Sequence, residues 1–137
     1  RCCPLQEREL IMTAIRGIER SCLDLIKESA RSVFPREFGG FLAVGDNPQV
    51  IDEVVLLPGT VAGNAHTIFQ MHMAPPDPSL VGTVHSHPSP HPLPSEADLH
   101  MFQRYGRVHI IIARPFDNHS WRAYDHRGRP TSLEVVE

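Results

Sequence analysis

The chain has 137 residues, 41% of them hydrophobic, and a formal net charge of −3, which fits one soluble globular domain. Acidic and basic residues are interleaved, so the sequence lacks the basic patch expected of a surface that binds nucleic acid or an anionic membrane. No run of 18 apolar residues occurs, which excludes a transmembrane helix. We therefore expect a single domain over residues 1–137 whose partners include neither nucleic acid nor a membrane.

The cysteines favour a reducing compartment. Cys2, Cys3 and Cys22 form an odd set without a CxxC pair, unlike the disulfide framework of a secreted scaffold. Charged residues such as Arg16 and Glu19 interrupt the N-terminal apolar positions, so the pattern of a signal peptide is missing. We expect a cytoplasmic protein in which Cys22 is a small core residue, and a Cys3–Cys22 bridge is the less favoured alternative.

The first predicted element is one long amphipathic helix over residues 5–33. Apolar side chains recur every three or four residues along it, which makes one stripe. These positions are Ile11, Ile15, Ile18, Cys22, Leu25, Ala30 and Val33. Pro35 ends the helix, because the residue before a proline is disfavoured in the helical region.

Alternating and continuous apolar runs predict the remaining elements. Strands are expected at 38–44, 49–57, 66–73, 80–85, 108–114, 120–124 and 132–136, and a second helix at 95–105. The first two strands are close enough to form a hairpin, and the very apolar run 108–114 predicts a central strand. This order predicts an α/β (α+β) fold with a mixed sheet between two helices.

All nine histidines lie from His66 onward. His66 and His72 are interpreted as surface histidines or as residues that surround a metal site without ligating it. His109, at the start of the predicted central strand, and His119 and His126, in predicted turns, are assigned no role. Histidine enrichment in one half of a chain is nevertheless consistent with a metal or acid–base site in that half.

The stretch 82–98 has the pattern of a metal site. Side chains two residues apart on a strand project to the same face, so His85 and His87 can reach one ion from the end of a strand. The loop 88–94 has a proline at every second position, which restricts the path to the next helix. Asp98 follows in the first turn of that helix. His85, His87 and Asp98 would supply the three protein ligands of a catalytic zinc, with water as the fourth.

A hydrolytic site also needs a base and a donor to the oxyanion. Glu37, at the entrance of the strand 38–44, is the candidate that accepts a proton from a zinc-bound water and passes it to the leaving amine. Ser95 is the candidate donor to the oxyanion. The segment Ser95-Glu96-Ala97-Asp98 also fits a helix capping box, which would explain both Ser95 and Asp98 without any metal.

Together these segments point to a known family. His85-Ser86-His87-Pro88 followed by Ser95-Glu96-Ala97-Asp98 resembles the HSHP-x(6)-SxxD signature of the JAMM (MPN+) zinc metalloproteases. The segment 35–42, Pro-Arg-Glu-Phe-Gly-Gly-Phe-Leu, resembles the glutamate-bearing first strand of that family. The resemblance covers essentially the whole chain, and its compact length is similar to that of stand-alone archaeal members.

The resemblance implies a deubiquitinase-like fold, related to that of cytidine deaminases, that cleaves isopeptide bonds. By the same resemblance, His85, His87 and Asp98 would bind one Zn²⁺ per chain, Glu37 would be the general acid/base and Ser95 the oxyanion contact. The implied partners are conjugates of a ubiquitin-like small modifier protein.

Three other functions are alternatives to the isopeptidase. One is a processing peptidase for a sulfur-carrier protein tail, and another is a non-catalytic metal-binding scaffold, which would not need an acid at Glu37. A cytidine deaminase is disfavoured because the chain has no CxxC pair for the metal. Within the loop, His91 is interpreted as an exposed residue, with an extra metal ligand or a substrate contact as alternatives.

Overall fold

The structure is a computed structural model that describes residues 14–56 and 77–137. In these ranges the chain forms two helices and eight strands. The helices are α2 (Arg20–Val33) and α4 (Glu96–Arg104). The strands are β1 (Gly17–Glu19), β2 (Gly39–Val44), β3 (Val50–Leu56), β4 (Leu80–His87), β5 (Val108–Ala113), β6 (Trp121–Asp125), β7 (Pro130–Thr131) and β8 (Glu134–Val136).

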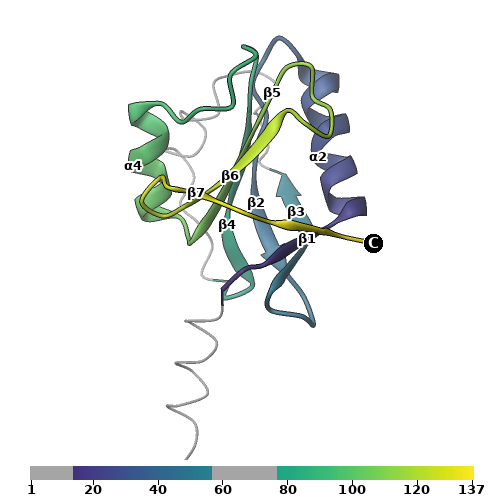
Figure 1. Cartoon of the computed structure of the whole chain (residues 1–137), viewed down its shortest axis with the longest axis vertical. Coiled ribbons are helices and arrows are strands. Elements are labelled where there is room, and N and C mark those ends of the chain that lie inside the picture. Colours follow the sequence, from purple (N-terminus) through teal and green to yellow (C-terminus); the bar gives the residue numbers. More distant parts are fainter. Residues whose placement is uncertain (1–13, 57–76) are drawn as a thin grey trace, which may run out of the picture.

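The strands form one mixed sheet in the order β7-β6-β5-β4-β2-β3-β1-β8. Strand β2 is antiparallel to both β3 and β4, whereas β4 and β5 are parallel. β7 and β8 lie at opposite edges although only residues 132–133 separate them. Seven inter-strand spacings of about 4.8 Å would place the edges of a flat sheet far beyond the reach of two residues. The sheet therefore curls, and the C-terminal segment crosses from β7 to β1 (Figure 1).

The two helices lie on opposite sides of the curled sheet (Figure 1). On one side, buried residues of α2, among them Leu23, Ile26 and Ala30, belong to the larger core cluster with Leu42 and Ile110 of the strands. On the other side, α4 contributes Met101 and Phe102 to a smaller cluster with Phe41, Ile111 and Tyr124. This arrangement confirms the predicted mixed sheet between two helices. Within the described residues, neither helix has the length and apolar character needed to cross a bilayer.

The first helix begins later than predicted. Gly17–Glu19 is the strand β1, which pairs in parallel with both β3 and β8, and α2 starts only at Arg20. Ile15, Ile18 and Cys22 fit a helical period, but the pairing of Gly17–Glu19 with two strands overrides that local preference. A Cβ on Gly17 would lie 3.0 Å from the Glu134 carbonyl oxygen, so the glycine permits the close approach of β8.

Two further differences concern the helix face and the C-terminus. Leu25, predicted on the apolar stripe, is 43% exposed, whereas Cys22 is buried as predicted. The strand predicted at 132–136 is shortened to β8, and the residues before it, Pro130–Thr131, form the separate strand β7 at the opposite edge of the sheet. The helix end before Pro35, the β2–β3 hairpin and the central position of β5 are confirmed. The predicted strand 66–73, with His66 and His72, lies outside the described residues, as do Cys2 and Cys3.

Candidate metal centre

The end of β4 carries two histidines from the interior of the sheet to its rim. β4 lies between β2 and β5, and all its residues from Val81 to Ser86 are buried. His85 has no exposed surface, whereas the side chain of His87 is 14% exposed. The intervening Ser86 projects to the other face, where its hydroxyl accepts a hydrogen bond from the Phe38 amide at 2.9 Å. Both histidines therefore project to the same face of the strand end.

Asp98 reaches the same place from the first turn of α4. Ser95 is the N-cap of this helix, and its Oγ accepts a hydrogen bond from the Asp98 amide at 3.1 Å. In return, the Ser95 amide donates to Asp98 Oδ2 at 2.8 Å. This reciprocal capping box fixes the rotamer of Asp98. The predicted cap is therefore present, and it holds the carboxylate in one orientation.

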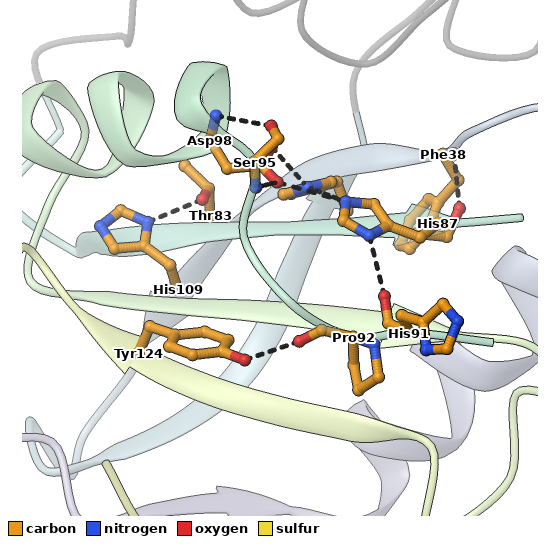
Figure 2. A network of polar contacts seen from close by, with 11 residues as sticks. Phe38, Thr83, His87, His91, Pro92, Ser95, Asp98, His109 and Tyr124 are labelled. Atoms are coloured by element: carbon orange, nitrogen blue, oxygen red, sulfur yellow. Dashed lines mark hydrogen bonds and ion pairs between the residues drawn. The ribbon is translucent and has the colours of Figure 1, made fainter. Parts of the chain in front are cut away.

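The three side chains converge: each offers one ligand atom, and these atoms lie within 4.8 Å of one another. Figure 2 shows His87 directed toward Asp98. His85 Nε2 lies 3.0 Å from Asp98 Oδ1, and His87 Nε2 lies 3.2 Å from Asp98 Oδ2. The two Nε2 atoms are 3.2 Å apart. Asp98 has no exposed side-chain surface. A capping box alone needs neither histidine, so the convergence requires a reason beyond helix capping.

A backbone contact sets the tautomer of His87. Its Nδ1 lies 3.2 Å from the carbonyl oxygen of His91, and a carbonyl can only accept, so Nδ1 carries the proton. In the neutral ring Nε2 then carries no proton, and its lone pair faces the Oδ2 atom of Asp98. Two acceptors at this distance repel each other unless a proton or a cation lies between them. The contact from His91 is thus the kind that orients a metal-ligating imidazole.

The pKa of His87 is raised by the acidic residues around it. Burial lowers this pKa, but hydrogen bonds with the Asp98 carboxylate and the His91 carbonyl, and the negative charges of Asp98 and Glu37, outweigh burial and raise it above 6.5. The acidic neighbours of His87 therefore favour a positive charge at this position.

The donor set fits zinc. Zn²⁺ takes imidazole nitrogen and carboxylate oxygen at about 2.0–2.2 Å in tetrahedral geometry, which places ligand atoms about 3.3 Å apart. The two Nε2 atoms are 3.2 Å apart, and each lies 3.0 or 3.2 Å from a different carboxylate oxygen of Asp98. Catalytic zinc sites have three protein ligands and a water, whereas structural sites have four protein ligands, so this set matches the catalytic type.

Glu37 lies beside this centre because of the strand register. Gly39 of β2 pairs with His85 of β4 in antiparallel register, and continuing that register places Glu37 opposite His87. The Ser86 amide donates to the Phe38 carbonyl at 3.0 Å, which holds the chain in this alignment. The half-buried Glu37 is close enough for its charge to raise the pKa of His87. The carboxylate predicted as a base therefore lies at the rim of the three-residue cluster.

The loop 88–94 is held by two hydrogen bonds to residues of β6 and of the segment after β5. The Tyr124 hydroxyl of β6 donates to the Pro92 carbonyl at 2.6 Å (Figure 2). The Arg114 amide donates to the Ser89 carbonyl at 3.1 Å. The side chain of His91 is exposed, and among the described residues only its backbone is seen to contact the site. Tyr124 and the carbonyl role of His91 have no signature in the sequence, because both depend on how the loop folds over β6.

Comparison with known proteins identifies the class. The family model of prokaryotic homologues of the JAB domain matches residues 19–126. The chain is 34% identical over 129 residues to a "probable metalloprotease" from Haloferax volcanii, a match that spans 88% of this chain and 80% of that protein. The chain therefore belongs to the prokaryotic JAB family.

Solved structures agree with this assignment. A JAB1/MPN domain protein from Archaeoglobus fulgidus is 38% identical and superposes with a TM-score of 0.71, over 90% of this chain and 99% of that one. A structure described as "JAMM: A Metalloprotease-like Zinc Site in the Proteasome and Signalosome" is 38% identical, with a TM-score of 0.70 over 90% and 100% of the two chains. A protein from Desulfitobacterium hafniense, 14% identical with a TM-score of 0.61 over 88% and 92%, shares the fold. The chain is thus a metalloprotease-like JAMM/MPN protein with a His-His-Asp candidate zinc site.

Proposed function

We propose that the chain is a zinc-dependent isopeptidase that hydrolyses the bond between the C-terminus of a ubiquitin-like small modifier and a lysine. The observation that carries the proposal is the convergence of His85, His87 and Asp98 at separations of 3.0–3.2 Å. The resemblance of the HSHP-x(6)-SxxD segment to JAMM metalloproteases supports the isopeptide bond as the substrate.

In this mechanism His85, His87 and Asp98 would hold Zn²⁺, which would supply Lewis-acid activation of water and of the scissile carbonyl. The capping box keeps Asp98 oriented, and the His91 carbonyl keeps His87 Nε2 free of its proton at neutral charge. Neither ligand therefore needs to reorganise when the ion binds.

Glu37 moves the proton. Its carboxylate accepts a proton from the attacking water and then protonates the leaving lysine amine, so that one residue acts as base and then as acid. Its place opposite His87 in the β2–β4 register, at the rim and half-buried, gives it access to both water and substrate.

Ser95 stabilises the oxyanion. The hydroxyl oxygen accepts from the Asp98 amide, so its single proton remains available for donation. Ser95 is exposed at the start of α4. Capping and oxyanion stabilisation use different lone-pair and proton sites of one hydroxyl, so both roles are compatible.

The test combines a substrate panel with a variant of the base. Isopeptide-linked and linearly linked ubiquitin-like substrates are incubated with the zinc-loaded protein, with and without a chelator. We expect chelator-sensitive cleavage of the isopeptide substrate. Glu37→Gln should keep about one zinc per chain while kcat falls roughly 10²–10⁴-fold, the usual contribution of general acid–base catalysis.

Other outcomes would redirect the assignment. Cleavage of the linear substrate alone would indicate a processing peptidase for a protein tail. Zinc binding without cleavage of any substrate would indicate a scaffold. Full activity of Glu37→Gln would remove Glu37 from the mechanism.

A further inference from the structure

His109, a buried histidine outside the proposed ligand set, lies on β5, the strand that pairs with β4 next to the candidate metal centre. His109 of β5 has no exposed surface. Its Nδ1 lies 2.7 Å from the Thr83 hydroxyl, and its Nε2 lies 3.2 Å from the Gly106 carbonyl oxygen. Its ring stacks on Phe102, with ring centroids 4.3 Å apart and planes inclined by 10°. Figure 2 shows the contact between His109 and Thr83 on the side of the sheet that faces α4.

These contacts fix the state of the imidazole. The Gly106 carbonyl can only accept, so Nε2–H donates to it and Nδ1 accepts from the Thr83 hydroxyl. Burial lowers the pKa of His109 to about 4, so the ring is neutral at physiological pH. The ring is thus a neutral link with one tautomer and a partner on each nitrogen.

The partners of His109 lie on the two elements that carry the ligands. Thr83 is two residues before His85 on β4, and hence on the same face of the strand. Phe102 is four residues after Asp98 on α4, and hence on the same face of the helix. His109 therefore contacts both β4, through Thr83, and α4, through Phe102, on the same faces of these elements that carry His85 and Asp98.

This connection adds to the contacts that Asp98 itself makes with His85 and His87. The capping box ties Asp98 to its own helix, and the apolar contacts of Met101 and Phe102 with the sheet are not directional. The hydrogen bonds of His109 are directional, and they reach Gly106, just beyond the C-terminal end of α4. We infer that His109, through Thr83 and Phe102, is a positioning residue that sets the placement of Asp98 relative to His85 and His87.

The inference rests on the proposed metal site and is tested by metal affinity and by ligand geometry. Thr83→Val removes the hydroxyl at nearly constant volume, and His109→Leu removes both hydrogen bonds. Zn²⁺ affinity is measured by competition with a chromophoric chelator, and the visible absorption spectrum of the Co²⁺-loaded protein reports the geometry of the ligands. We expect both variants to bind Zn²⁺ about tenfold or more weakly, as is typical when the groups behind metal ligands are changed, and to have an altered Co²⁺ spectrum.

Two control variants separate positioning from general damage. Thr83→Ser keeps a hydroxyl and should restore both affinity and spectrum. Ile112→Val alters a buried residue of the same strand β5 that belongs to the core on the α2 side, and it should lower stability without changing either readout.

The outcomes distinguish this inference from the proposed function. Wild-type affinity and an unchanged Co²⁺ spectrum in Thr83→Val and His109→Leu would overturn the positioning role and leave the zinc site standing. Weakened binding in Ile112→Val as well would also overturn it, because any loss of stability would then have the same effect. A wild-type chain that binds neither Zn²⁺ nor Co²⁺ would overturn both.

Discussion

The two helices cover opposite sides of one sheet, yet they meet it in different ways. α2 packs on its side through apolar residues such as Leu23, Ile26 and Ala30, and its N-cap, Glu19, makes no side-chain cap hydrogen bond. α4 begins with a complete capping box, and it meets the sheet where the buried polar residues His85, Asp98 and His109 gather.

The contrast separates stability from function within one small fold. Apolar packing under α2 contributes to stability in proportion to buried area and tolerates small shifts. Buried polar groups under α4 are stable only when each has its partner, so they specify one arrangement. We therefore expect changes on the α2 side to affect mainly stability, and changes on the α4 side to affect mainly the site.

The largest expected difference between the two helices concerns their first aspartates. Asp98→Asn replaces a buried carboxylate that contacts both histidines, so zinc should be lost and hydrolysis should fall to background. Asp24→Asn on α2 removes an exposed carboxylate that pairs only with Lys27 at 3.1 Å among the described residues, and it should leave both unchanged. Zinc content by elemental analysis and isopeptide hydrolysis measure the difference. Equal zinc content in the two variants would contradict the assignment of metal binding to the α4 side of the sheet.

The next difference is that the two sides lose stability at opposite ends of the pH scale. Burial lowers the pKa of His109 from 6.5 to about 4, so its contribution is complete above pH 6.5 and is lost as pH falls toward 4. Burial, with smaller effects from Asp52, Glu19 and Glu53, raises the pKa of the Cys22 thiol from 9.0 to about 12. Its contribution is complete below pH 9 and is lost as pH rises toward 12.

The pKa shifts of His109 and of Cys22 each change the free energy of unfolding by an amount on the order of 3 kcal/mol across their pH ranges. The check is the free energy of unfolding by denaturant as a function of pH for the wild type, His109→Leu and Cys22→Ala. His109→Leu should flatten only the acid limb, and Cys22→Ala only the alkaline limb. A variant that changed the opposite limb would contradict the assignment of its group to that side.

The smallest expected difference concerns the helix caps. Ser95→Ala removes a working cap from α4 and should lower the free energy of unfolding by about 1 kcal/mol. Glu19→Ser places a good capping residue at the uncapped start of α2 and should raise it by a few tenths to about 1 kcal/mol. Chemical denaturation of both variants checks the signs, and a destabilised Glu19→Ser would show that the pairing of Glu19 in β1 outweighs its role at the helix start.

The sequence was most predictive where local chemistry and tertiary structure agree. Pro35 ends α2 as expected, and Ser95 caps α4 as expected, because proline geometry and capping are local effects. The spacing of His85, His87 and Asp98 predicted a meeting that the β4–α4 connection produces. Gly17–Glu19 was predicted as helix because its period fits one, and only pairing with β3 and β8, more than thirty and more than a hundred residues away, makes it a strand.

The residues that surround the ligands could not be predicted in this way. His109 was assigned no role from the sequence because its partner Thr83 becomes a neighbour only through the parallel pairing of β4 and β5. Its contact with Gly106, three residues earlier, involves a backbone carbonyl. The contact of the His91 carbonyl with His87 involves a backbone atom, which leaves no mark on residue type. Long-range register and backbone acceptors are therefore the parts of this site that required the structure.

The central claim is that His85, His87 and Asp98 hold zinc. X-ray absorption at the zinc edge of the wild-type protein loaded with one equivalent of Zn²⁺ tests this claim most directly, because it identifies the atoms bound to zinc. The chain also contains three cysteines, and cysteine is a common zinc ligand in proteins. The account predicts nitrogen and oxygen neighbours at about 2.0–2.2 Å, with the multiple-scattering pattern of two imidazoles and no sulfur. A sulfur neighbour at about 2.3 Å, or a first shell without imidazole, would contradict it.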